Sequence, residues 1–192
     1  MKVTKAQAQA NRAHIVETAS ALFRERGFDG VGVADLMAAA GFTHGGFYKH
    51  FGSKADLMAE SASCGFANSS ESLGEMDAAA FLGHYLSREH RDNPGQGCTM
   101  AALCSDAARQ PTSVKQAFVA GIEAQLAAGQ GHHAQEATAA QGARAERIAL
   151  IAQAVGAIVL SRSCPDDSSL AEEILEVCRA DVLARLSRAP DA

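Results

Sequence analysis

Several residue types and patterns that mark particular protein classes are scarce in this sequence of 192 residues. Tryptophan is absent and aromatic residues make up 5% of the chain, so a core has to be built mainly from Ala, Leu, Ile and Val. We find no alternating run of β-branched residues that predicts a strand. The four prolines stand at expected helix ends and not inside apolar periodic runs. These features predict an all-α fold.

The sequence also lacks the patterns of secreted, membrane and metal-binding proteins. Its most apolar window, 148–160, is too short to span a bilayer. The N-terminus opens with polar residues, which argues against a secretory signal. The five cysteines have no metal-ligand spacing, and neither do the histidines at 84, 90, 132 and 133. We therefore expect a cytoplasmic protein with reduced thiols, no membrane partner, no cofactor and no metal site.

Charge is distributed unevenly along the chain. The net charge of −5 is the sum of +3 in residues 1–54 and −8 in the remainder. A basic head on an acidic body predicts that only the head meets an anionic surface.

The apolar spacing and the positions of Gly, Pro, Ser and Thr predict a series of helices. Residues 68–77 are expected to be a linker, and residues 129–142 a loop. The predicted helices cover about 7–26, 33–40, 44–51, 54–67, 77–91, 98–110, 113–128, 143–163 and 168–188.

The three short helices at the N-terminus have the dimensions of a helix-turn-helix, with Gly41 in its tight turn. Phe42 is expected to fill the gap between the two helices of the motif. Phe47 and Phe51 form the inner face of the third helix, and its other face carries small and basic residues. Glycines near the start of this helix would let the backbone approach a DNA groove closely.

The stretch 27–57, GFDGVGVADLMAAAGFTHGGFYKHFGSKADL, resembles the signature of the tetracycline-repressor (TetR) family of transcriptional regulators. The similarity covers roughly residues 8–60. Gly32 departs from the pattern, because the family usually places a Ser or Thr cap there. The landmarks present are Gly27-Phe28, Asp35-Leu36, Gly41-Phe42-Thr43, Tyr48, Phe51 and Ser53-Lys54.

This resemblance implies how the head would contact double-stranded DNA. Tyr48 and Lys54 would bind phosphates. The alternative is that Tyr48 fills core and Lys49 is a solvated charge. The residues in or beside the major groove would be Thr43, His44, Gly45, Gly46, Lys49 and His50.

The resemblance further implies two domains: a helix-turn-helix domain at 1–54 and a helical regulatory and dimerisation domain at 55–192, connected by the helix that begins near 54. The apolar stripes of the last two helices are wider than one internal contact requires, which favours a homodimer on a palindromic operator over an ordinary internal hairpin. The expected interface residues are Ile151, Val155, Ile158, Val159, Ile174 and Val182.

The sequence identifies a small-molecule pocket in the body less clearly than the DNA-binding residues of the head. Its candidate residues are apolar with a few polar groups, as in small-molecule sites generally, although they would serve equally as core. Cys98 is expected in the first turn of a helix, where the dipole favours a thiolate, or as a small buried residue. The candidates are Phe66, Phe81, Tyr85, Cys98, Met100, Leu103, Phe118 and Ile122.

Three classes of function compete. The leading hypothesis is a transcriptional repressor released from its operator by a small molecule, with electrophile or redox sensing through Cys98 as the alternative. An enzyme with Cys98 as nucleophile and His84 or His90 as base has no recognisable third group, so we expect no catalytic residues. A helical interaction module leaves the confinement of basic charge to residues 1–54 unexplained.

Overall fold

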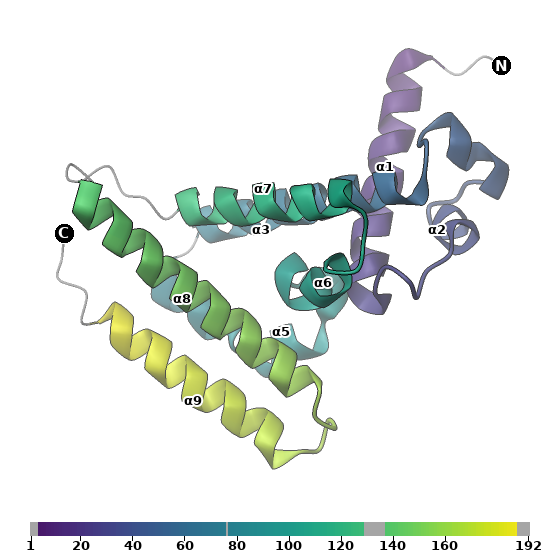
Figure 1. Ribbon diagram of the computed structural model, residues 1–192. Helices are drawn as coiled ribbons and strands as arrows, with labels where there is room; N and C mark the ends of the chain where they lie inside the picture. Colours follow the sequence, from purple (N-terminus) through teal and green to yellow (C-terminus); the bar gives the residue numbers. More distant parts are fainter. Residues whose placement is uncertain (1–3, 76, 129–136, 188–192) are drawn as a thin grey trace. The chain divides into compact units, whose positions relative to one another are not determined.

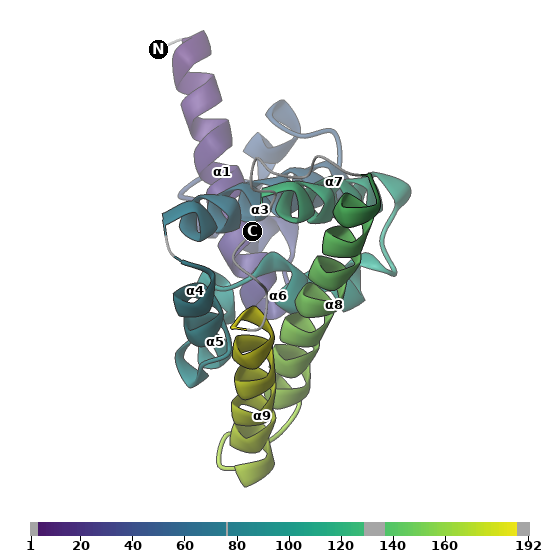
Figure 2. The ribbon, with the colours of Figure 1, turned by 90° about the vertical axis from the view of Figure 1, so that its left-hand side faces the viewer.

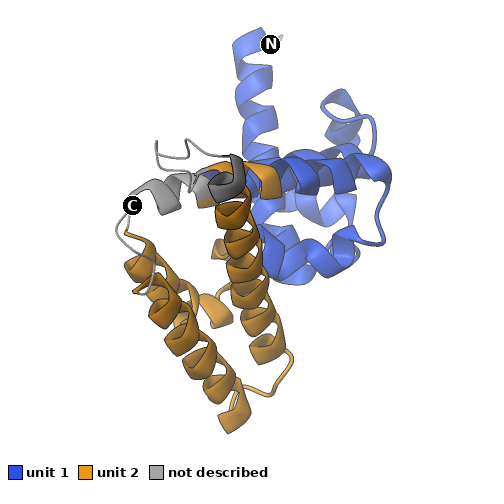
Figure 3. Cartoon of the chain, turned by 60° about the vertical axis from the view of Figure 1, so that its left-hand side comes forward, with its two compact units in different colours: residues 1–68, 98–121 blue, residues 69–97, 122–192 orange. Residues whose placement is uncertain are grey.

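The computed structural model describes residues 4–75, 77–128 and 137–187 (Figure 1). Throughout these ranges the regular structure is helical and no residue lies in a strand, which confirms the all-α prediction. The chain divides into two compact units, residues 1–68 with 98–121, and residues 69–97 with 122–192 (Figure 3). The division into functional domains near residue 54 remains a prediction, because these units follow packing and not function.

Most helix boundaries lie close to the predicted ones. In chain order the helices are α1 Lys5–Arg26, α2 Val33–Ala39, η1 His44–Lys49, α3 Lys54–Glu75, α4 Ala78–Tyr85, α5 Arg88–Asp92, η2 Pro94–Gln96, α6 Thr99–Ala107, α7 Thr112–Ala128, α8 Ala137–Arg162 and α9 Ser169–Leu186.

Local chemistry sets the ends of the N-terminal helices. Thr4 Oγ1 accepts the Gln7 N–H at 3.1 Å and starts α1, and Gly27, with φ +76°, ends it. Gly41 has φ +79° and makes the tight turn after α2, as predicted. Ser53 Oγ accepts the Asp56 N–H at 3.1 Å and starts α3.

Three predictions of helix extent are corrected. Residues 68–75, expected to be linker, continue α3, since this segment contains no proline and one glycine at 74. The helix expected over 77–91 is interrupted at Leu86–Ser87, because Ser87 Oγ accepts the His90 N–H at 3.2 Å and starts α5. Of the loop expected at 129–142, residues 137–142 begin α8, and 129–136 lie outside the described residues.

The third helix of the head is a 3₁₀-helix and not an α-helix. Within η1 and at its end the backbone bonds span three residues, as from Gly46 N–H to Thr43 O at 2.9 Å and from His50 N–H to Phe47 O at 2.9 Å. Two consecutive glycines make the α-helical form of this short segment unfavourable.

Aromatic and aliphatic side chains build the core of the first unit. Phe47 is 1% and Phe51 3% exposed, and both face inward as predicted. Leu22 of α1, next to the buried Phe23, is only half-buried. Other core residues of the first unit that are at most 1% exposed are Ile15, Ala19, Phe23, Phe28, Val31, Leu36, Met37 and Leu57.

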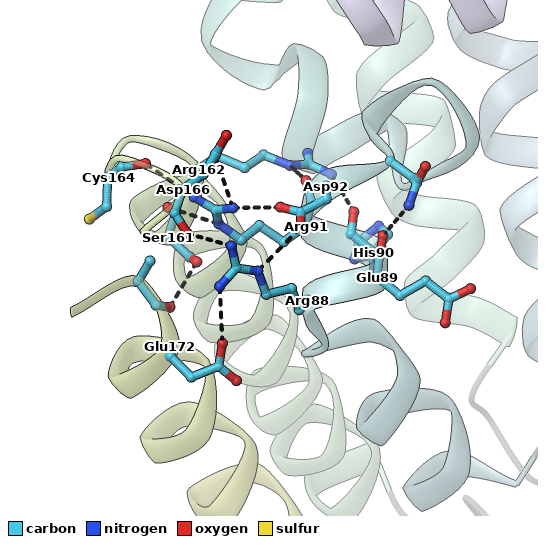
Figure 4. Close-up of polar contacts among 12 residues, drawn as sticks. Arg88, Glu89, His90, Arg91, Asp92, Ser161, Arg162, Cys164, Asp166 and Glu172 are labelled. Carbon is cyan, nitrogen blue, oxygen red and sulfur yellow. Dashed lines mark hydrogen bonds and ion pairs between the residues drawn. The ribbon is translucent and has the colours of Figure 1, made fainter. Parts of the chain in front are cut away.

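In the second unit, α8 and α9 run side by side as a helical pair (Figures 1 and 2). Arg91 of α5 forms hydrogen bonds with the end of α8 and with the segment that connects it to α9 (Figure 4). The Arg91 side chain is 3% exposed and donates to Ser161 O at 3.2 Å and Cys164 O at 3.1 Å. Its charge is balanced by Asp92 and, at 3.3 Å, by Asp166. Arg91 therefore binds the C-terminal end of α8 and the start of the connection to α9.

A second arginine makes hydrogen bonds in the opposite direction, from α8 to α5. Arg162, at the end of α8, donates to Arg91 O at 2.8 Å and to His90 O at 2.7 Å. Burial lowers the pKa of His90 to about 4, so its ring is neutral near pH 7. The neutral ring can donate from Nδ1 to the Tyr85 carbonyl, 2.7 Å away. The α5 turn is thus tied to the α8–α9 pair by backbone carbonyls more than by ion pairs.

We predict that Arg91→Ala lowers the free energy of unfolding by about 2–4 kcal/mol, because buried carbonyl and carboxylate oxygens lose a charged donor. Arg88, whose side chain is 47% exposed, is the control, and Arg88→Ala is expected to cost less than about 1 kcal/mol. Urea denaturation of both variants measures the difference. Equal losses would show that Arg91 has no special structural role.

Candidate nucleic-acid interface

Phe42, in the turn of the helix-turn-helix, lies near α1 and near the residue that follows η1. Phe42 follows Gly41 and is half-buried, with its ring centroid 6.4 Å from that of His14 and 6.5 Å from that of His50. Phe42 therefore packs between an exposed residue of α1 and the residue that follows η1.

The η1 segment has one apolar face and one open face. Phe47 lies in the core, whereas Tyr48 is 70% exposed. This partition matches the sequence prediction for the segment. Of the remaining predicted contact residues, Thr43, His44, Gly45 and Lys49 are exposed, and Gly46 and His50 are half-buried.

Within the part of the chain that the structure describes, neither backbone conformation nor packing requires glycine at positions 45 and 46. Neither residue has a positive φ. A Cβ on Gly45 would meet no atom within 4 Å, and a Cβ on Gly46 would make ordinary contacts with Met37 Cε at 3.6 Å and Thr43 Oγ1 at 3.7 Å. Because glycine destabilises helical segments relative to alanine, these two residues favour a surface that another molecule approaches closely.

The two residues expected to bind phosphates are placed differently. The Tyr48 ring packs edge-on against Phe47, with centroids 5.2 Å apart, and stays exposed. Lys54 is half-buried, and its ammonium donates to Phe28 O at 2.6 Å and lies 5.9 Å from the centroid of the Phe23 ring. A lysine has three N–H donors, so one bond to a carbonyl leaves two for another acceptor.

Arg12 is a residue of the head that sequence reasoning missed. Its guanidinium pairs with Glu60 of α3, donates to His50 O at 3.3 Å and lies 4.8 Å from the centroid of the Phe51 ring. These contacts fix the end of η1 between α1 and α3. No local pattern identifies them, because Glu60 and His50 are 48 and 38 residues away along the chain.

The candidate pocket residues fall into the two compact units. Within the first unit, the Phe66 and Phe118 rings meet at 5.3 Å, and Phe66 packs so closely on Gly121 that no side chain fits there. In the second unit, the Phe81 ring lies 5.9 Å from that of Tyr85. The first unit holds Phe66, Cys98, Met100, Leu103 and Phe118, and the second holds Phe81, Tyr85 and Ile122. A common pocket remains a prediction.

All five cysteines are free thiols. Cys98 is the N-cap residue of α6 and is 7% exposed. Burial, and then the proximity of Cys98, raise the pKa of Cys104 to about 11. Burial, and then Glu17, raise the pKa of Cys64. The thiols of Cys64 and Cys104 are therefore protonated and weakly nucleophilic at neutral pH.

The predicted dimer residues require a correction. Ile158 and Val182 are both 0% exposed within a single protomer, so their side chains cannot contact a second copy. Ile151, Val155 and Ile174 are half-buried, and Val159 is 44% exposed. Helical spacing alone could not separate the stripe used inside the protomer from the stripe left outside. The large apolar side chains exposed on α8 and α9 are Ile148, Val159, Leu160, Leu170 and Val177.

Metal-binding clusters and membrane-spanning helices are both absent from the described residues. In this part of the chain no three His, Cys, Asp or Glu side chains gather in a way that could hold a metal ion. His132 and His133, considered for such a site, lie outside it. Within the same residues, no helix combines the length and apolarity needed to cross a membrane.

Known proteins resemble this chain most clearly in the head. Residues 15–60 match the family model of "Bacterial regulatory proteins, tetR family". The HTH-type transcriptional regulator AcrR of Shigella flexneri is 40% identical over 57 residues, which cover 30% of this chain and 26% of that protein. The HTH-type transcriptional repressor DhaR of Mycobacterium sp. (strain GP1) is 49% identical over 43 residues, 22% of each chain. The chain thus matches about a quarter of the length of these relatives.

The likeness of fold extends over nearly the whole chain. The crystal structure of a TetR-family transcriptional regulator from Agrobacterium tumefaciens has a TM-score of 0.69 and 21% sequence identity. The match covers 93% of this chain and 98% of that one. The arrangement of helices is therefore that of known regulators with an N-terminal helix-turn-helix and a C-terminal helical domain.

We predict that Gly45→Ala leaves thermal stability unchanged or raises it, because the new Cβ meets no atom within 4 Å and alanine favours helical backbone. The same change is expected to weaken binding to duplex DNA about tenfold, or about 1.4 kcal/mol, by placing a methyl group on the approached surface. Gly83→Ala in α4, where a Cβ also meets nothing within 4 Å, is the matched control. Unaltered DNA affinity in Gly45→Ala, measured by fluorescence anisotropy, would contradict the close approach.

Proposed function

We propose that this chain, whose residues 15–60 match the family model of the TetR bacterial regulatory proteins, is a regulator of that family: a DNA-binding transcriptional repressor that a small molecule releases from its operator. The observation that carries this proposal is the open face of η1, which presents glycines, an exposed tyrosine and basic side chains on a packed aromatic base. Such a face suits the major groove of double-stranded DNA.

Two kinds of contact are proposed for this face. Tyr48 and Lys54 bind phosphates, Tyr48 through its exposed hydroxyl and Lys54 through the N–H donors that Phe28 O leaves over. These contacts position the head without reading sequence. The groove residues are Thr43, His44, Gly45, Gly46, Lys49 and His50, of which Lys49 and the histidines are the candidates for reading bases.

We further propose that two copies pair through α8 and α9 and bind a palindromic operator. The support is the set of exposed apolar side chains on these helices, of which Val177 is 61% and Leu160 58% exposed. Large apolar side chains gathered on the surface of a helical pair favour an interface. A dimer would also double the number of base pairs that one short helix contacts.

The releasing signal is proposed to be an apolar molecule that binds reversibly to the body. We favour this over cysteine modification because the Cys98 side chain is buried, and an electrophile has to reach the sulfur. The family match over residues 15–60 supports a regulator over an enzyme, and we propose no catalytic activity for the chain. A regulator of transcription acts where the DNA is, so we propose that it works in the cytoplasm.

For the phosphate contacts we predict that Lys54→Ala lowers the log–log salt slope of DNA binding by about one unit, since one fewer counterion is released. Tyr48→Phe is expected to weaken binding without altering which sequence is preferred. Salt titrations with a labelled duplex test both, with Lys115→Ala, an exposed lysine of α7, as the control. If Lys54→Ala keeps the parent's affinity and slope, Lys54 does not bind phosphate.

For the dimer we predict that Val177→Glu gives folded monomers, because Val177 is exposed in the protomer and a charge in an apolar interface is strongly unfavourable. Ile158→Glu should instead unfold the α8–α9 pair, since Ile158 is completely buried. Sedimentation velocity reports the assembly and circular dichroism the folding. A Val177→Glu protein that still sediments as a dimer would place the interface elsewhere.

A further inference from the structure

Phe28 is bonded on both sides of its backbone and buried at its ring. Its N–H donates to Asp106 Oδ2 of α6 at 2.9 Å, and its carbonyl accepts from Lys54 Nζ of α3 at 2.6 Å. The ring is 0% exposed, 5.1 Å from the ring of Phe23 and 6.5 Å from that of Phe118. Phe28, a single residue in the turn that follows α1, thus contacts α3, α6 and α7 within the first compact unit.

The carboxylate of Asp106 lies close to the backbone of the turn at Gly27 and Phe28. Gly27 has φ +76°, and a Cβ there would lie 2.6 Å from Asp106 Oδ2. Glycine is therefore needed at position 27 both for its backbone conformation and for the approach of the carboxylate. The other carboxylate oxygen of Asp106 accepts from Arg109, whose side chain is 64% exposed, at 2.7 Å. The side chain of Asp106 is 19% exposed, so water competes weakly for this bond.

We infer that Asp106 is a positioning residue for phosphate binding by Lys54, an inference that rests on the proposed DNA-binding function. The Phe28 carbonyl positions the Lys54 ammonium by accepting a hydrogen bond from it. The hydrogen bond from the Phe28 N–H to Asp106 in turn positions Phe28. A flexible lysine side chain loses rotamer freedom when it binds a phosphate. Anchoring it beforehand on a fixed carbonyl reduces that loss.

The same contact links α6 to the DNA-binding surface. Asp106 lies in the last turn of α6, and Lys54 is the first residue of α3. A shift of α6 that withdraws the carboxylate leaves the Phe28 N–H without its acceptor and frees the turn that anchors Lys54. Movement of α6 therefore alters one phosphate contact through three named residues, with no rearrangement of η1.

The test is a double-mutant cycle between Asp106 and Lys54, read as the salt dependence of binding to a labelled duplex of random sequence. Asp106→Ala is expected to weaken binding and lower the log–log salt slope by up to about one unit, as Lys54→Ala does. The double variant should be no weaker than Lys54→Ala alone. Asp106→Asn keeps an oxygen that can accept the Phe28 N–H, so it should keep most of the parent's slope.

Two further variants separate positioning from folding. Arg109→Ala removes the ion-pair partner of Asp106 and leaves the bond to Phe28, so its slope should match the parent's. Should Asp106→Ala not fold, Asp106→Ser gives the same comparison, since its hydroxyl is too short to reach the Phe28 N–H. A merely structural role would lower the melting temperature and leave the slope unchanged.

The outcomes distinguish this inference from the proposed function. If the parent protein binds DNA with a steep salt slope that Lys54→Ala reduces, additive effects of Asp106→Ala and Lys54→Ala overturn the positioning role alone. An unchanged slope in folded Asp106→Ala does the same. If the parent shows no salt-dependent DNA binding, or Lys54→Ala does not change it, the proposed function or the proposed role of Lys54 fails, and the inference fails with it.

Discussion

The first compact unit depends on one backbone constraint, the left-handed conformation of Gly27 followed by the doubly bonded, buried Phe28. The turn ends α1 and directs the chain into α2. Its Phe28 N–H donates to a carboxylate of α6, and its Phe28 carbonyl accepts from an ammonium of α3. Arg12 adds a second brace, from α1 to the end of η1 and to α3. The short 3₁₀ segment that faces outward is therefore held by contacts of its neighbours more than by its own weak helical propensity.

The second unit solves a related problem with different chemistry. Its short α5 helix has too few residues to be stable alone. Arg91 and Arg162 fasten it by donating to carbonyl oxygens at the end of α8 and on α5 itself. Guanidinium groups suit this task because their planar fork reaches several acceptors at once. These bonds hold α5 against the C-terminal end of α8 and the start of the connection to α9.

The accuracy of sequence reasoning depended on how local each feature is. Helix limits at Gly27, Gly41 and Ser53, and the inward face of η1, follow from neighbours within a few residues, and these predictions were confirmed. The helix break at Ser87 was missed because one capping hydroxyl decides it.

Long-range features were less accessible. The bond between Asp106 and Phe28 joins residues 78 apart, and no periodicity encodes it. The assignment of Ile158 and Val182 to the dimer failed because periodicity identifies a buried stripe but not the surface that buries it. The proposed pocket and the proposed base-reading residues are defined by their contacts with other molecules, which the sequence does not contain.

The absence of side chains at Gly45 and Gly46 also affects how such a regulator could come to bind a different DNA sequence. Every glycine codon is a single base change from an alanine codon and from an arginine codon. Because a Cβ at Gly45 meets no atom within 4 Å, the fold accepts a new side chain there without compensating changes elsewhere. Point mutation can therefore add a base-reading group, or a steric block, directly to the outward face. The stability of the head and its proposed DNA specificity can then evolve independently at this position.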